Sequence, residues 1–332
     1  MMIWEKTKTS GMLLCLALCA ACSSDNDDPV VVQPPVTSYP LTIEVSENPL
    51  IPDGQEARGA TRASITTTTT LTKFNLNYVY NVTSTGSEEV EKEGRIWKVT
   101  NNNGWPSDAA VTDVEVTWYA STAGTFNLNE GDPYIDFTVE ADAAKQKDLL
   151  VAKTSGKFSD YYPNGENVKS LSFTFDHACT ALKFYVKKAK NLEDYTLKVS
   201  NIKLKNVVNS GKYNYGSGKW TFRTNSDFTL LSTETTLSSD SYTLLNGDEE
   251  NSYLFMIPQE LTAWNPEQAL SDCYLEIVCE ITKDGNTVYS GTPYIPAYIP
   301  FSAAFVKGNQ HDVKINIGKN SLYRGQNTKI FN

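Results

Sequence analysis

Apolar and polar residues alternate with a period of two along most of the chain after residue 63. The clearest apolar faces are Phe74, Leu76, Tyr78 and Tyr80; Val114, Val116, Trp118 and Ala120; Ile135, Phe137 and Val139; Leu171, Phe173 and Phe175; and Leu182, Phe184 and Val186. Alternation over about four to eight residues is typical of a half-buried β-strand. Many such strands, separated by polar turns at intervals of roughly 8 to 15 residues, predict an all-β protein of antiparallel β-sandwiches.

Breaks in the alternation mark turns and bulges. The apolar face shifts parity between Val199 and Ile202, which predicts a β-bulge between them. Asp284-Gly285 lies between two apolar runs and predicts a tight hairpin. Residues 141–147 are expected to form a single helical turn.

The strand count divides the secreted part of the chain into two. About seven predicted strands precede residue 190 and about seven or eight follow it, which fits two sandwiches of ordinary size. The polar stretch 187–194 separates them. We therefore predict tandem β-sandwich domains over residues 63–190 and 191–332.

The first residues carry an export signal. Lys6 and Lys8 precede a short apolar run, 12–21, which ends in small residues directly before Cys22. This pattern is typical of a signal peptide, and the run is too short to span roughly 30 Å of hydrocarbon. It predicts a lipoprotein signal over residues 1–21, with Cys22 as the lipidated N-terminus that holds the protein at a membrane.

Residues 22–62 form a polar linker that contains six prolines and one strand pattern. In that pattern Leu41, Ile43 and Val45 alternate with polar residues. A lone strand must pair with a sheet elsewhere, because its backbone groups otherwise stay unpaired. We therefore expect this strand to join the domain that follows it.

Two further features of the linker bear on export and processing. The acidic run 23–28 lies directly behind Cys22 and resembles the export tag of surface lipoproteins in Gram-negative anaerobes, which implies display on the outer membrane. Arg58 and Arg62 lie beyond the strand pattern. Basic residues in a flexible stretch are open to a trypsin-like protease.

The composition limits the classes of function that the chain can have. The net charge is −10, and no basic patch suits nucleic acid, so we expect no nucleic-acid partner. After Cys22 the chain has only Cys179, Cys273 and Cys279, and this odd, sparse set predicts buried thiols rather than disulfides. His177 and His311 are the only histidines, which leaves little material for a metal centre or catalytic triad. We predict no enzyme activity, no catalytic residue, no metal and no cofactor.

Two short motifs resemble ligand loops but lack the pattern that each requires. Residues 216–219, Gly-Ser-Gly-Lys, have neither the earlier glycine nor the following helix of a phosphate loop, so a tight turn is favoured. The acidic run 246–250 lacks the ligand spacing of a calcium loop, and we expect a solvated turn. Paired carboxylates for glycoside hydrolysis are not identifiable from spacing, because such pairs meet only in the fold.

A series of motifs runs along the whole secreted part. They are Thr61-Arg62-Ala63 with Ile65-Thr66-Thr67, Trp105-Pro106, Val116-Thr117-Trp118-Tyr119-Ala120, Asp148-Leu149-Leu150-Val151-Ala152, Phe173-Thr174-Phe175-Asp176-His177-Ala178, Ile202-Lys203-Leu204-Lys205-Asn206, Met256-Ile257-Pro258-Gln259, and Gly308 with His311-Asp312-Val313. In this order, behind a lipoprotein signal, the chain resembles the fimbrillins, which are type V pilus subunits and their surface relatives.

The resemblance implies two transthyretin-like sandwiches in a lipidated precursor. It also implies assembly with other fimbrial subunits at the outer membrane, and a host or bacterial receptor or glycan as a further partner. In that family an arginine-specific protease removes the N-terminal segment, and a strand from the next subunit fills the groove. Carried over to this chain, cleavage follows Arg58 or Arg62 and displaces the strand of Leu41, Ile43 and Val45. Strand addition of this kind supplies affinity through main-chain hydrogen bonds.

Two questions stay open at this point. Polymerising pilins usually carry a further strand after the segment that corresponds to 311–317, whereas the tail 318–332 is polar, so shaft, tip, anchor and accessory roles all remain. The alternative function is a lipid-anchored surface glycan-binding protein that stacks sugars on exposed rings. The candidate rings, each of which also suits a core position, are Trp105, Tyr213, Tyr215, Trp220 and Trp264.

Overall fold

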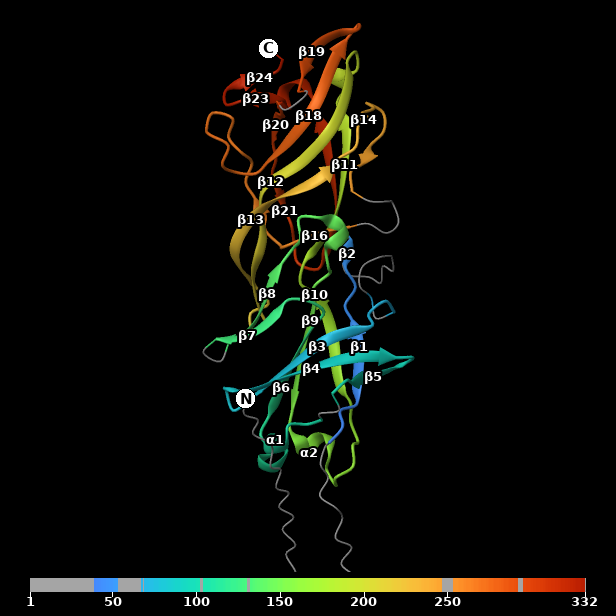
Figure 1. Ribbon diagram of the computed structural model, residues 1–332, viewed down its shortest axis with the longest axis vertical. Helices are drawn as coiled ribbons and strands as arrows, with labels where there is room; N and C mark the ends of the chain where they lie inside the picture. Colours follow the sequence, from blue (N-terminus) through green and yellow to red (C-terminus); the bar gives the residue numbers. More distant parts are fainter. Residues whose placement is uncertain are drawn as a thin grey trace, which may run out of the picture. The chain divides into compact units, whose positions relative to one another are not determined.

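The computed structural model describes residues 39–331, with gaps at 53–66, 68, 102–103, 130–131, 247–252 and 292–294. The described residues form an all-β structure, as predicted (Figure 1). Helical segments are short: α1 (Ser107–Thr112), α2 (Phe158–Tyr161), and the 3₁₀ turns η1 (Ala143–Lys145), η2 (Lys190–Leu192) and η3 (Lys319–Ser321). No helix in this part of the chain is long and apolar enough to cross a membrane.

The first sheet closes on itself. In spatial order its strands are β1 (Ile43–Glu47), β10 (Leu171–His177), β9 (Leu150–Gly156), β6 (Val116–Ser121), β3 (Lys73–Tyr80), β4 (Ser84–Glu93) and β5 (Ile96–Val99). β1 and β10 run parallel, and the other neighbours run antiparallel. One residue pair, Ile43 with Trp97, joins β1 to β5 and closes the barrel. We call the apolar cluster inside it the barrel core, in which Phe74, Trp118 and Phe173 are at most 2% exposed.

Two larger sheets and one two-stranded sheet complete the described structure. One contains β15 (Thr243–Leu244), β11 (Thr180–Lys188), β22 (Asn309–Ile317), β2 (Ile51–Pro52) and β16 (Leu254–Met256). The other contains β24 (Thr328–Lys329), β23 (Tyr323–Gly325), β20 (Ala297–Pro300), β18 (Tyr274–Lys283), β12 (Thr196–Asn214), β8 (Asp132–Thr138), β7 (Thr125–Asn129), β13 (Trp220–Leu231), β14 (Thr235–Thr236) and β19 (Asn286–Ser290). A separate pair is formed by β17 (Glu260–Leu261) and β21 (Ala303–Ala304).

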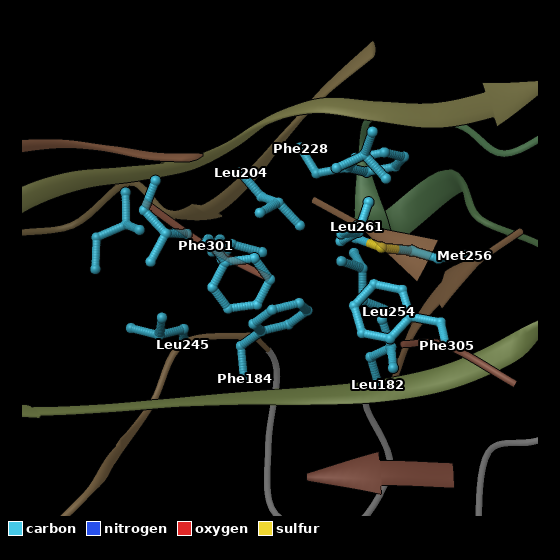
Figure 2. Close-up of a cluster of buried hydrophobic side chains, with 14 of the residues drawn as sticks. Leu182, Phe184, Leu204, Phe228, Leu245, Leu254, Met256, Leu261, Phe301 and Phe305 are labelled. Atoms are coloured by element: carbon cyan, nitrogen blue, oxygen red, sulfur yellow. The ribbon is translucent and has the colours of Figure 1, made fainter. Parts of the chain in front are cut away.

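These two sheets enclose a second apolar cluster, which we call the sandwich core. Figure 2 shows Leu182 and Phe184 from β11 pointing toward Leu204 from β12, with Phe228 and Met256 beside them. All five side chains are fully buried. Two sheets that are each apolar on one face bury those faces against one another, which is the arrangement of a β-sandwich.

The two cores draw on overlapping parts of the chain on the N-terminal side of the predicted boundary between residues 190 and 191. Phe184 of β11 and Ile135 of β8 belong to the sandwich core although both precede that boundary. Phe175, near the end of β10, belongs to the barrel core. We propose that the second structural unit begins at Ala178 and also takes in β7 and β8.

Candidate functional site

Residues 39–52 form one extended segment, which we call the covering segment (Figure 1, blue). Its strand β1 pairs in parallel with β10 through five residue pairs, opposite Leu171–Phe175. β10 meets its other neighbour, β9, only through Asp176 and His177. Among the described strands, β1 is therefore the only ladder partner of Leu171–Phe175. A strand edge that loses its partner leaves backbone groups that bind another strand.

The apolar face of the covering segment is the one that the sequence predicts. Ile43 is 5% exposed, and Leu41 and Val45 are partly buried against the barrel core. The residues between these three are exposed. The strand begins two residues later than the predicted range 41–45, at Ile43, and continues to Glu47.

An aromatic cluster holds the start of the covering segment. The ring of Tyr39 lies 4.6 Å from that of Phe158 and 5.4 Å from that of Tyr162, between centroids. The Tyr39 carbonyl accepts a hydrogen bond of 2.7 Å from the Trp105 amide. A Cβ at Gly104 would lie 1.7 Å from that carbonyl oxygen, so only glycine permits the approach.

After β1 the covering segment crosses from the barrel to the second sheet. The Asn48 side chain donates a hydrogen bond of 2.7 Å to the Asp176 carboxylate on β10. Leu50 then enters the sandwich core, where it is 6% exposed. The Ile51 amide donates to the Gly308 carbonyl at 2.9 Å, and β2 pairs in parallel with β22. One segment thus contributes to both cores.

Sequence reasoning missed this second half of the covering segment. Pro49 and Pro52 flank Leu50 and Ile51, and prolines indicate a break in regular structure. The available signal was the apolar pair itself, since two adjacent aliphatic residues between prolines are unusual in a solvated linker. Prolines are tolerated here because β2 is a short edge strand.

The predicted lipidation and cleavage residues lie outside the described part of the chain. Cys22 precedes it, and Arg58 and Arg62 lie in the gap at 53–66. Both strands of the covering segment lie N-terminal to both arginines in the sequence.

The candidate rings for sugar stacking are core or partly buried residues rather than exposed platforms. Trp105, Tyr213, Tyr215 and Trp264 are at most 6% exposed, and Trp220 is half-buried. Two of these rings bond the interior backbone: the Trp220 indole donates to the Ala178 carbonyl and the Tyr215 hydroxyl to the Ala120 carbonyl, each at 2.9 Å. Among the exposed large apolar residues of the described chain, the one aromatic ring belongs to Phe222.

The interior of the described structure holds a buried His–Asp pair and three buried thiols. His177 Nδ1 lies 2.9 Å from Asp148 Oδ2, and both side chains are 2% exposed. Cys179, Cys273 and Cys279 are free and buried, as predicted. Burial raises the pKa of Cys273 and of Cys279 to about 12, so neither is a nucleophile near neutral pH. Within the described residues, no three His, Cys, Asp or Glu side chains gather as a metal site.

The glycine-rich run 216–219 forms the turn between β12 and β13, as predicted. Gly218 has a φ of 66°, and the Ser217 amide donates to the Asn214 side chain at 2.7 Å, which together fix a tight turn. No helix follows, so no phosphate loop is present there. The acidic run 246–250 lies outside the described residues after Asn246.

Comparison with known proteins identifies the chain's relatives. The sequence matches the model of a family described as fimbrillin-like over residues 59–330, which is most of the chain. The chain belongs to the fimbrillin-like family. The resemblance drawn from the sequence motifs is thereby confirmed. No curated protein matches the chain.

One of the solved structures found has a TM-score above 0.5 and supports the fold of this fimbrillin-like chain, and others align over most of its length. A fimbrial protein from Bacteroides vulgatus is 18% identical, with a TM-score of 0.52 and coverage of 85% of this chain and 96% of that one. A proposed cell adhesion protein from Bacteroides ovatus is 17% identical, with a TM-score of 0.44 and coverage of 86% and 94%. A fimbrial assembly protein from Parabacteroides distasonis is 12% identical, with a TM-score of 0.39 and coverage of 86% and 93%. Family membership supports a fimbrial or adhesion subunit at the cell surface.

Proposed function

We propose that this protein is a structural or adhesive subunit of a cell-surface fimbrium, exported as a lipoprotein through Cys22. Cleavage after Arg58 or Arg62 frees the covering segment, and a strand from another subunit takes its place. The single observation that carries this proposal is the pairing of β10. Leu171–Phe175 depend on β1 for their ladder, so the barrel needs a strand in that position whatever chain supplies it.

The position of the arginines supports a single cut as the trigger. β1 and β2 both precede Arg58 in the sequence, so one cut at either arginine breaks the covalent link to the whole covering segment. The cut segment then stays only by non-covalent contacts. A replacement strand offered at high local concentration competes with it on equal terms.

The packing of the C-terminal tail, residues 318–332, indicates which position this subunit takes in the fimbrium. The tail folds onto its own sheet as β23 and β24, with Leu322 fully buried. Phe331 packs on Tyr195 at a centroid distance of 5.4 Å. A tail held in this way is not immediately available to a neighbour. We therefore propose that the protein acts first as an acceptor of a strand, in a tip, anchor or accessory role.

The test is cleavage of purified residues 23–332 with an arginine-specific protease. Mass spectrometry identifies the cut, and native gel electrophoresis follows the oligomeric state. We expect a clean cut after Arg58 or Arg62, followed by dissociation of the covering segment when a donor subunit is added. The double variant Arg58→Lys/Arg62→Lys keeps the charge and removes the protease site, and is the matched control.

Three outcomes are distinguishable in this experiment. A ladder of multimers after cleavage supports strand exchange between copies of this chain. Cleavage without a ladder, with capture of a donor subunit, supports an acceptor that ends a chain. Resistance of both arginines in the folded protein contradicts processing by this route.

A second candidate function, binding of a surface saccharide, is favoured by one polar cavity. It has a volume of about 660 Å³, within the size range of ligand pockets, and lies between β3 and β4 on one side and β8, β12 and β13 on the other. Lys73 pairs with Glu89 at 3.1 Å in one wall and Arg223 with Asp136 at 2.9 Å in the other. Glycan-array binding that Arg223→Ala abolishes would support this function, and an array without signal would count against it.

A further inference from the structure

The covering segment is anchored in both cores. Ile43 packs in the barrel core, and Leu50, seven residues later in the sequence, packs in the sandwich core. An extended chain of that length reaches at most roughly 23 Å. A slip of one residue turns every following side chain to the opposite face. An occupant of both anchor sites must therefore keep this spacing.

The change from one sheet to the other is fixed by the residues between the anchors. The Asn48 amide donates to the Phe175 carbonyl at 2.8 Å and extends the β10 ladder by one residue. Pro49 follows and has no N–H, so the ladder stops there. The next backbone donor used is the amide of Ile51, which bonds the carbonyl of Gly308, directly before β22.

Asp176 adds a chemical requirement at this crossing point. Its carboxylate accepts a hydrogen bond from Asn48 Nδ2 at 2.7 Å. Among the described residues no lysine, arginine or histidine forms an ion pair with Asp176. An ionised carboxylate only accepts, so the site takes an amide, a hydroxyl or a cation and repels an acid.

We propose that the surface beneath the covering segment selects its occupant by this pattern. The occupant has an apolar residue for the barrel core. Five residues later it has a hydrogen-bond donor that faces the Asp176 carboxylate, and seven residues after the first it has an apolar residue for the sandwich core. Asp176 is thus the residue that determines specificity. The proposal rests on the proposed function, in which the covering segment is replaced by a strand of another subunit.

A second copy of this chain supplies an occupant that fits. In its tail, Tyr323 and Ile330 are seven residues apart, and Thr328 follows Tyr323 by five. Phe331 falls where Ile51 lies in the covering segment, so residues 319–332 align with 39–52. Gly325 falls in the position of Val45 and offers no side chain there. The tail therefore satisfies the pattern but loses three apolar contacts, because Lys319, Ser321 and Gly325 stand where Tyr39, Leu41 and Val45 pack against the barrel core.

The spacing is tested in the intact chain by hydrogen exchange. One alanine inserted between Ser46 and Glu47 lengthens the distance between the anchors, whereas the same insertion between Gly54 and Gln55 does not. We expect the amide of Asn48 or of Ile51 to exchange at least tenfold faster in the first variant and at the native rate in the second. Native protection of both amides in the first variant would overturn the fixed spacing.

The requirement at Asp176 is tested by peptide exchange on the full chain cut after Arg62. A labelled 39–52 peptide is incubated with the cut protein, and its uptake is compared with that of the Asn48→Asp and Asn48→Gln peptides. We expect uptake of the Asn48→Asp peptide to fall about tenfold, and uptake of the Asn48→Gln peptide to stay within about threefold of the native value. Uptake of the Asn48→Asp peptide should recover when the protein carries Asp176→Asn. Equal uptake of the native and Asn48→Asp peptides would overturn the role of Asp176.

The tail is tested in the same assay as a competitor. Unlabelled 319–332 peptide should reduce uptake of the labelled 39–52 peptide, and its Ile330→Asp variant should not. Failure of the native 39–52 peptide to exchange would contradict strand replacement, the proposed function itself. The fixed spacing is still decided in that case, because hydrogen exchange in the intact chain does not depend on replacement.

Discussion

The two ends of the described chain both add strands to a sheet edge, but only one of them completes its sheet. The covering segment is the sole described ladder partner of Leu171–Phe175 in β10. β23 in the tail meets β20 through a single pair, Tyr298 with Tyr323, while β20 keeps four pairs with β18. Loss of the covering segment therefore opens a closed sheet, whereas loss of the tail removes only two short strands from the edge of a sheet.

Different forces hold the two ends. The tail depends on side-chain burial, chiefly Leu322, which is fully buried, and Phe331 against Tyr195. The covering segment depends on a backbone ladder and on two apolar anchors, Ile43 and Leu50. A ladder accepts any sequence with the right side-chain pattern, because main-chain hydrogen bonds are common to all residues. This difference suits the covering segment to replacement, and it means that the tail must leave its own sheet before it can act as a donor.

The largest expected effect is that of Ile43→Asp in the covering segment. It places a charge in the barrel core without a partner, so we expect the free energy of unfolding to fall by about 3–5 kcal/mol. Urea unfolding followed by tryptophan fluorescence measures it, because Trp97 lies opposite residue 43. Glu44→Gln, on the exposed face of β1, is the control and should change stability by less than about 0.5 kcal/mol. Equal stability of the two variants would mean that β1 does not close the barrel.

The next effect is that of Leu322→Ala in the tail. Truncation of a fully buried leucine leaves a cavity, and we expect a loss of about 3 kcal/mol. The Ile330 amide, which donates to the Leu322 carbonyl at 3.0 Å, should exchange faster, while the amides of β1 keep their native rate. Lys329→Ala, exposed on β24, is the matched control. Faster exchange throughout β1 in the Leu322→Ala variant would contradict the independence of the two ends.

Local structure was predictable wherever neighbouring residues determine it. The parity shift after Val199 corresponds to a register shift between Val199 and Asn201 in the pairing of β12 with β18. Asp284 and Gly285 have φ values of 52° and 79°, as a tight hairpin requires. The apolar face of the covering segment, with Ile43 at its centre, was also predictable, because alternation alone defines it.

Pairing between distant strands was not predictable. Alternation says that Leu171 and Phe173 face a core, but not that β1 runs parallel to them. Nor does it assign Ile135 to the sandwich core. Register and sheet membership depend on contacts far apart in the sequence. The crossing at Leu50 was missed for a further reason, since its flanking prolines mask a two-residue edge strand.

A smaller effect on the covering segment is expected from Gly104→Ala. The new Cβ would lie 1.7 Å from the Tyr39 carbonyl oxygen, so the start of the segment must move, at a cost of about 1–3 kcal/mol. Faster hydrogen exchange of the Trp105 amide, which donates to that carbonyl, measures the movement. Gly216→Ala is the control, since its nearest contact is a side-chain oxygen 3.2 Å away. An unchanged Trp105 amide would show that this contact does not hold the segment.

The smallest expected effect is a dependence of stability on pH that differs between the two ends of the chain. Burial raises the pKa of Cys273 and of Cys279 to about 12; Cys279 lies on β18, in the sheet that carries the tail, and Cys273 directly precedes that strand. Because the folded state keeps these thiols protonated, their contribution is complete below the unfolded pKa of about 8.5 and is lost as the pH rises toward 12. At pH 9 we expect a loss of less than about 1 kcal/mol per thiol.

Urea unfolding at pH 7.5 and 9 measures this loss, and Cys279→Ala should reduce the dependence on pH. The covering segment should be insensitive over the same range. Burial raises the pKa of Tyr162 above its usual value of 10, so its hydroxyl keeps the proton that it donates to the Pro40 carbonyl. Loss of the Tyr39 contacts at pH 9, seen as faster exchange of the Trp105 amide beyond the change in intrinsic rate, would contradict this separation. Retention of those contacts while the tail's sheet weakens would show that the two ends of the chain are stabilised independently.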